Sequence, residues 1–277
     1  MTKVKRFDFS EAEPDRVWLL KGLIIGARNT GKTVLLRDIL YKMRRHIDFA
    51  VAMTTTVSTA EMLKKVLPPK LVHSDGYDPE CAEKFLQCSK TLVRMGTKRK
   101  MALILDDCMF DTTVMKSKCQ RELHLNGRHY HTSVFNTTQY VMAIPPLIRS
   151  NIDYVIALKE PVKANRRKLY EYFYGVFPSF EEFESTFAAC TDNYGCMVLD
   201  RTKGDTSLRS MIRFYRASAK LPPFTIGGGG VVEKSEKEED AQQPTRTSRT
   251  RRVLLSSVLT NSKKSRPPRK KTHFNVG

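Results

Sequence analysis

Residues 26–33 read Gly-Ala-Arg-Asn-Thr-Gly-Lys-Thr, which matches the pattern G-x-x-x-x-G-K-[ST] at every position. In this pattern the backbone N–H groups of a glycine-rich loop surround the phosphates of a nucleotide. An apolar stretch over 17–25 predicts a buried strand before the loop, and apolar residues at helical spacing over 34–43 predict a helix after it. This is the context that the motif requires, because a helix N-terminus favours bound phosphate.

Each position of this Walker A loop has an expected role. Lys32 places a positive charge on the β- and γ-phosphates, and the hydroxyl of Thr33 ligates Mg²⁺. We therefore expect ATP and Mg²⁺ as cofactors. The residues expected to bind the nucleotide are Gly26, Ala27, Arg28, Asn29, Thr30, Gly31, Lys32 and Thr33.

A second motif is acidic. The apolar run over 101–106 predicts a strand that closes on Asp106-Asp107, the arrangement of a Walker B motif. We expect Asp106 to hold Mg²⁺ and Asp107 to orient or deprotonate the attacking water. Many P-loop ATPases carry a glutamate at the second position. The aspartate of this chain has a shorter side chain, so its carboxylate extends less far toward the attacking water.

Three further polar residues are candidates for catalysis. Gln139 follows the expected strand 132–138, about where ATPases with an additional central strand carry a polar sensor of the γ-phosphate. Hydrolysis also needs a cation on the developing charge, often an arginine from a neighbouring subunit. Arg128 and Arg149 are the candidates, and a surface salt bridge is an equally open interpretation of each.

The order of expected elements predicts an α/β fold. Strands alternate with helices, which is typical of a mostly parallel sheet with helices on both faces. Two final runs predict a C-terminal β-hairpin over 195–216. The expected strands cover 17–25, 48–55, 101–106, 132–138 and 153–158, and the expected helices cover 34–43, 58–66, 79–94, 112–126, 145–150, 163–174 and 179–190.

Composition divides the chain into three parts. Residues 1–14 form an N-terminal arm, 15–226 the P-loop ATPase domain, and 227–277 a Gly-rich, charged linker with a basic tail. The tail is expected to be disordered, because its composition cannot bury a core. It is either a solvated end or a tether for DNA or a capsid protein. Six cysteines without a C-x-x-C pair or metal spacing predict reduced, buried thiols.

The net charge of +19 indicates a polyanionic partner, with nucleic acid favoured over a membrane surface. The basic tail does not explain this charge alone, because residues 231–277 hold only 12 of the 48 lysines and arginines. The clusters at 98–100 and 163–168 are candidate phosphate contacts or simply solvated faces. The apolar runs are far shorter than the ~20 residues of a membrane-spanning helix.

Together these motifs resemble the DNA-packaging ATPases of nucleocytoplasmic large DNA viruses, the poxvirus-type branch of the FtsK/HerA superfamily. The resemblance covers roughly residues 15–225 and rests on the two Walker motifs, on the 126–129 turn Asn-Gly-Arg-His, on the strand ending at Gln139, on residues 148–151 and on the hairpin. It implies a RecA-like ATPase and a sensor role for Gln139.

The resemblance also implies a biological setting. A homo-oligomeric ring would drive double-stranded DNA into a capsid, with a capsid, portal or nuclease partner. The protein would act in a virus factory or the nucleus of the host cell and then enter the virion.

Other P-loop proteins are the alternatives. A nucleoside or nucleotide kinase has a similar size, and the arginines of 163–168 would serve as its lid. Asp106-Asp107 after a strand, followed by a polar-ended strand, favours a hydrolase over such a kinase. A helicase is a second alternative, although no further helicase motifs are recognisable. A GTPase is disfavoured because the guanine-reading Asn-Lys-x-Asp is missing from the sequence.

Overall fold

The computed structural model describes residues 4–7, 20–108 and 112–227. The strands are β1 (Lys5–Arg6), β2 (Lys21–Ile25), β3 (Phe49–Thr54), β4 (Val72–His73), β5 (Met101–Asp106), β6 (Thr132–Thr138), β7 (Tyr154–Ala157), β8 (Gly195–Asp200) and β9 (Ile212–Arg216). The α-helices are α1 (Lys32–Met43), α2 (Val57–Val66), α3 (Pro79–Arg94), α4 (Thr112–Lys116), α5 (Lys118–Asn126), α6 (Pro146–Ser150), α7 (Lys163–Tyr172), α8 (Phe180–Thr191) and α9 (Leu208–Met211). Most of the expected arm, the first residues of the expected strand 17–25 and the tail beyond Gly227 lie outside the described residues.

One sheet contains all the described strands, in the order β1-β9-β8-β7-β2-β6-β5-β3-β4. The strands from β7 to β4 in this order are parallel, and β2 lies between β7 and β6. The last two strands, β8 and β9, add an antiparallel hairpin to β7, and β1 pairs with β9 at the edge. The expected mostly parallel sheet and its terminal hairpin are therefore confirmed.

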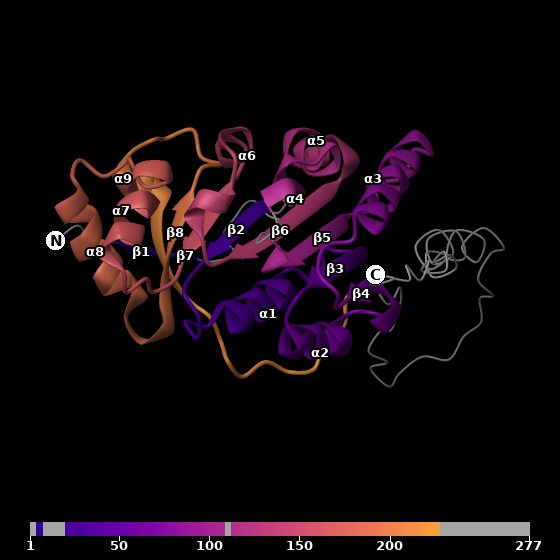
Figure 1. Ribbon diagram of the computed structural model, residues 1–277, viewed down its shortest axis with the longest axis horizontal. Helices are drawn as coiled ribbons and strands as arrows, with labels where there is room; N and C mark the ends of the chain where they lie inside the picture. The colour runs from indigo at the N-terminus through magenta and orange to yellow at the C-terminus, as the bar shows by residue number, and fades with distance from the viewer. Residues whose placement is uncertain (1–3, 8–19, 109–111, 228–277) are drawn as a thin grey trace, which may run out of the picture.

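Helices cover both faces of the sheet (Figure 1). Alternate side chains of a strand point to opposite faces. Ala102 and Ile104 of β5 pack with α1 and α2, whereas Leu103 and Leu105 pack with α3 and α5. Beside them α7 and α8 cover β7 and β8 with a cluster of phenylalanines. The parallel strands are buried on both faces, which explains why their sequences are continuously apolar.

Some elements differ from the expectation. The expected helix 112–126 is two helices, α4 and α5, because the Ser117 hydroxyl accepts a hydrogen bond from the Gln120 N–H and caps a new helix. The two-residue strands β1 and β4 have no hydrophobic pattern of their own and form only by pairing at the two edges. The hairpin contains the short helix α9 between its strands.

Strand direction gives the sheet two functionally different edges. We call the edge where β2, β3, β5 and β6 end the carboxyl edge, and the edge where they begin the amino edge. In open α/β sheets ligands bind at the carboxyl edge. Asp106 ends β5, and the Walker A loop, Asp107 and Gln139 directly follow strands, so all of them meet at that edge.

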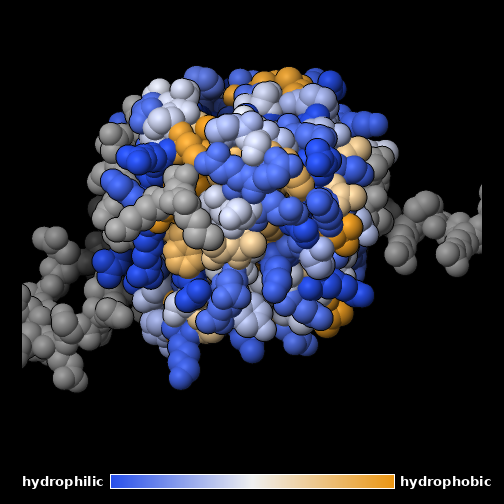
Figure 2. All heavy atoms as spheres, turned by 90° about the vertical axis from the view of Figure 1, so that its left-hand side faces the viewer, coloured by the Kyte–Doolittle hydropathy of each residue, from blue (hydrophilic) through white to orange (hydrophobic). Residues whose placement is uncertain are grey.

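The face of the molecule shown in Figure 2 is largely hydrophilic. Figure 2 views the molecule from the side of α7, α8 and β1, and hydrophobic residues form small separate areas among hydrophilic ones. Every described helix is too short or too polar to cross a lipid bilayer. Five of the six cysteines are buried and all six are unpaired thiols, as expected.

Candidate nucleotide-binding site

The Walker A loop joins β2 to α1 in a tight bend. Gly31 has a φ of 100° and Asn29 a φ of 59°, both in the left-handed region that favours glycine and asparagine. A Cβ atom on Gly26 would lie 2.6 Å from the Thr30 hydroxyl and 3.0 Å from the Cβ of Leu158. The loop therefore needs Gly26 for space and Gly31 for its backbone conformation.

Lys32 is the first residue of α1 and folds back over this loop. Its Nζ donates hydrogen bonds to the carbonyl oxygens of Gly26 at 3.0 Å and Ala27 at 3.1 Å, and the side chain is 9 % exposed. Carbonyl oxygens are weaker acceptors for an ammonium group than phosphate oxygens, because the phosphate oxygens carry a negative charge. The lysine is thus already positioned where phosphates would replace the carbonyl contacts.

Asp106 is fixed at the end of β5 by two threonines. Its Oδ2 accepts a hydrogen bond from the Thr54 hydroxyl at 2.9 Å, and its Oδ1 accepts one from the Thr137 hydroxyl at 2.6 Å. The carboxyl group is 2 % exposed and lies between neighbouring strands β3 and β6. These contacts fix the orientation of the carboxylate, which suits a residue that positions a metal shell.

Asp107 and Gln139 are brought together from two strand ends. The Gln139 Nε2 donates to the Asp107 Oδ2 at 3.1 Å, and the Asp107 N–H donates to the Thr137 hydroxyl at 3.1 Å. Asp107 has a φ of 50°, a conformation that aspartate tolerates better than most residues. Burial raises the pKa of the Asp107 carboxyl, and the charge of Lys32 and the Gln139 hydrogen bond oppose this rise.

Sequence reasoning missed several residues of this site. Thr54 and Thr137 hold Asp106, and the Thr59 hydroxyl of α2 lies 3.4 Å from the Thr33 hydroxyl. Single threonines do not form a recognisable sequence motif. Only the pairing register of the strands, which places Thr54 and Thr137 beside Asp106, could have identified them from the sequence. Both are at strand ends paired with Asp106.

Tyr194 is the other missed residue. It precedes β8 at the carboxyl edge, and a Cβ atom on Gly31 would lie 3.6 Å from its ring. Its side chain is 70 % exposed, and its backbone has a φ of 56° next to Asn193 with a φ of 47°. Two consecutive left-handed residues other than glycine are strained, and such strain is concentrated at functional sites.

Arg128 and Arg149 lie at the amino edge, away from the loop of their own chain. Arg128 forms an ion pair with Asp153, which immediately precedes β7. Arg149 stacks over the Tyr172 ring at 3.9 Å, and its carbonyl accepts a hydrogen bond from Arg201 at 2.7 Å. The structure therefore does not bring either arginine to Asp107 or Gln139.

The donors at the carboxyl edge fit a nucleotide with its metal ion. Lys32 and the N–H groups of the loop suit phosphate oxygens. A hydroxyl and a carboxylate, from Thr33 and Asp106, are oxygen ligands of the hard type that Mg²⁺ prefers. The site as a whole combines a phosphate cradle with a partly buried carboxylate that can accept a proton.

Known families and proteins match this chain. The family model described as "Poxvirus A32 protein" matches residues 11–165, which is more than half of the chain. Uncharacterized protein 075L of Invertebrate iridescent virus 6 is 32 % identical over 186 residues, which are 67 % of this chain and 72 % of that protein. Uncharacterized protein L437 of Acanthamoeba polyphaga mimivirus is 27 % identical over 223 residues, covering 76 % and 78 %.

Solved structures share the fold. The genome packaging NTPase B204 of Sulfolobus turreted icosahedral virus 2, in complex with AMP, superposes with a TM-score of 0.55 at 16 % identity. The match covers 73 % of this chain and 98 % of B204. The same protein in complex with AMPPCP gives a TM-score of 0.53. This likeness confirms the expected P-loop ATPase fold.

Proposed function

Because this chain belongs to the Poxvirus A32 protein family, we propose that it is an ATP-hydrolysing motor that translocates double-stranded DNA into a viral capsid. The observation that carries the proposal is the joint placement of the Walker A loop, Asp106, Asp107 and Gln139 at one edge of the sheet. The fold shared with the genome packaging NTPase B204 supports it. The relatives are viral proteins, which supports action in infected cells.

Binding is assigned to residues 26–33. The N–H groups of the loop and the Lys32 ammonium hold the phosphates, and Gly26 keeps the loop close enough to do so. Mg²⁺, when bound, neutralises charge on the β- and γ-phosphates. Thr33 and Asp106 would hold it, and Thr54 and Thr137 keep the Asp106 carboxylate in the required orientation.

Hydrolysis is assigned to Asp107 and Gln139. The Asp107 carboxylate accepts a hydrogen bond or a proton from the attacking water, and its partial burial raises its affinity for that proton. The Gln139 amide donates to Asp107 and holds the carboxylate toward the loop. A kinase would instead need a second substrate hydroxyl at this carboxylate.

The two arginines are proposed to act on a neighbouring subunit. A cation at the amino edge cannot reach the phosphates of its own chain, but in a ring it can face the carboxyl edge of the next subunit. Arg128 is the better candidate, because its side chain is 52 % exposed in spite of the ion pair with Asp153. A ring of identical subunits is therefore part of the proposal.

Stimulation by DNA tests the function. We expect ATP turnover by the wild type to rise several-fold with duplex DNA, and this rise to shrink as salt increases, because phosphate contacts release counterions. The measurement is phosphate release with and without a duplex at two or more salt concentrations. Turnover indifferent to DNA, together with transfer of phosphate to a nucleoside, would instead establish the kinase alternative.

Tyr194 is proposed to stack on the adenine base. Its exposed ring borders Gly31 of the phosphate loop. The ribose and base of a nucleotide whose phosphates are bound by the loop would extend past this ring. Stacking of a base on an aromatic side chain contributes about 1–3 kcal/mol. We expect Tyr194→Ala to weaken binding of a non-hydrolysable ATP analogue roughly tenfold or more, as measured by calorimetry.

Tyr194→Phe is the matched control, because it keeps the ring and removes only the hydroxyl. We expect its affinity for the analogue to stay within about twofold of the wild type. Equal affinities of the alanine variant and the wild type would exclude a stacking role.

A further inference from the structure

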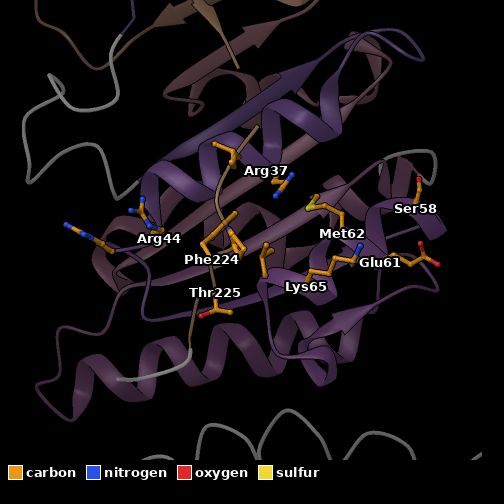
Figure 3. A pocket seen from close by; sticks show the side chains of 12 residues that line it. Arg37, Arg44, Ser58, Glu61, Met62, Lys65, Phe224 and Thr225 are labelled. Carbon is orange, nitrogen blue, oxygen red and sulfur yellow. The ribbon is translucent and has the colours of Figure 1, made fainter. Parts of the chain in front are cut away.

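A basic groove lies between α1 and α2 (Figure 3). These two helices cover the face of the sheet opposite α3 and α5 (Figure 1). The segment 221–225 forms its third side. The cavity has a volume of about 890 Å³. Its lining consists of Arg37, Arg44, Arg45, Ser58, Glu61, Met62, Lys65, Val66, Leu221, Pro223, Phe224 and Thr225.

The charge of this groove is unbalanced. Four cationic side chains line it, and Glu61 is its one carboxylate. Among the residues that the structure describes, Arg37, Arg45 and Lys65 form no ion pair. Four cations gathered in a hollow with a single carboxylate produce a local positive potential that attracts polyanions.

Arg44, another cation of the lining, is held in place by Tyr41. It stacks over the Tyr41 ring at 4.0 Å and donates to the Tyr41 carbonyl at 2.7 Å. Neither contact neutralises its charge, so Arg44 adds to the positive potential while holding a fixed position at the end of α1.

The positive surface continues beyond the groove on both sides. His46, next to Arg45, has a lowered pKa because of burial and then of the nearby charge of Lys100. The cluster 98–100 lies near this end of α1, and its Arg99 forms an ion pair with Asp48 at 3.5 Å. On the other side of α1 a hollow of about 220 Å³ is lined by Arg6, Lys42 and Arg216, with Asp38 beneath them. A track of this kind fits a chain of phosphates better than one small anion.

Both walls of the groove contact the nucleotide site. The helix α1 begins at Lys32 and carries Arg37. The helix α2 carries Lys65, and its Thr59 hydroxyl lies 3.4 Å from the Thr33 hydroxyl. A ligand in the groove would therefore touch the two helices whose other ends position the metal and the phosphates.

We propose that this groove binds the phosphodiester backbone of duplex DNA through Arg37, Arg44, Arg45 and Lys65. The inference rests on the proposed function, since it names where the transported DNA touches the motor. The partly exposed Met62 supplies apolar contact for the sugars, and the cations bind the phosphates without reading sequence.

The test compares two triple variants of equal charge change in the full chain. The groove variant is Arg37→Gln, Arg45→Gln and Lys65→Gln. The matched control is Lys116→Gln, Lys118→Gln and Arg121→Gln on α4 and α5, across the sheet from the groove. Binding of a fluorescent duplex is measured over a series of salt concentrations, and binding of an ATP analogue shows that each variant is folded.

We expect the groove variant to reduce the slope of log K against log salt by about 2–3, since each phosphate contact contributes about 0.9. The control variant should change this slope by less than about 1. The single variant Lys65→Gln should reduce the slope by about 0.9. Lys65 is at an exposed helix position, so this measurement remains informative even if the triple variant does not fold.

Three outcomes would overturn the assignment. The first is an equal change of the salt slope in the two triple variants while the wild type binds DNA. This result would leave the proposed function intact and exclude the groove as the DNA-binding surface. The second is a wild type that binds no duplex, in which case both fail. The third is a groove variant that binds duplex DNA as the wild type does but no longer binds an acidic peptide of the sequence 233–240. This result would assign the groove to the acidic run of this chain.

Discussion

Replacing Lys32 by alanine lowers the rate of ATP hydrolysis by about 10³-fold, or about 4 kcal/mol of transition-state stabilisation. The ammonium group is buried against the loop, where its charge is poorly screened by water. Its loss leaves the Gly26 and Ala27 carbonyls without their donor and the phosphates without their cation. Phosphate release at saturating ATP is the measurement, and thermal unfolding shows whether the variant is folded.

Lys32→Arg is the control for charge. It keeps the charge but places a larger planar group in the space below the loop, so we expect it to restore little activity. A Lys32→Ala variant with wild-type turnover would show that this loop is not the site of hydrolysis.

Lys32→Ala also provides the test of a trans arginine. In rings mixed from Lys32→Ala and Arg128→Ala subunits, some interfaces combine an intact loop with an intact arginine. Turnover above that of either variant alone supports Arg128 acting across the interface. Mixtures as inactive as the separate variants count against it, and the same experiment with Arg149→Ala ranks the two candidates.

The second large effect is expected for Asp107→Asn, which should lower kcat by about 10²–10³-fold with little change in KM for ATP. Asparagine is the informative replacement, because it tolerates the left-handed backbone at this position as well as aspartate does. It also keeps an oxygen that can accept the Gln139 hydrogen bond. The loss therefore measures the missing carboxylate in a nearly unchanged site, as read by single-turnover hydrolysis.

The pH dependence gives an independent check on Asp107. The ionised carboxylate is the active form, and burial raises its pKa above the ordinary value for aspartate. Turnover of the wild type should therefore fall on acidification at a higher pH than an exposed aspartate would give. The residual activity of Asp107→Asn should lack this acid limb. An identical acid limb in the variant would assign the titration to another group.

The sequence predicts the elements whose signals are local. The loop 26–33 and the apolar strands before it and before Asp106 are recognisable from residue order alone. The meeting of Asp107 with Gln139 follows from strand direction, because both come directly after parallel strands. The same rule places Arg128 at the opposite edge, because it precedes β6. The sequence was therefore sufficient to predict that Arg128 lies far from the loop of its own chain.

The remaining features depend on contacts between distant segments. Thr59 and Tyr194 approach the loop from α2 and from the turn before β8, and nothing in their own neighbourhood indicates it. The basic groove is equally hidden, because Arg37, Lys65 and Thr225 are far apart in the chain and become its walls only when the segment 221–225 packs beside α1 and α2.

The helix α1 joins the phosphate loop at one end to Arg44 just beyond the other. A helix of 12 residues is about 18 Å long, so a rotation at one end displaces the other end in proportion to this length. A tilt of about 10° at the loop would carry the far end through about 3 Å. That displacement is close to the rise of roughly 3.4 Å between successive phosphates of a DNA strand. If the groove binds DNA as proposed, a small change in how the loop holds the nucleotide phosphates would therefore suffice, at the far end of this helix, to advance the DNA by about one base pair.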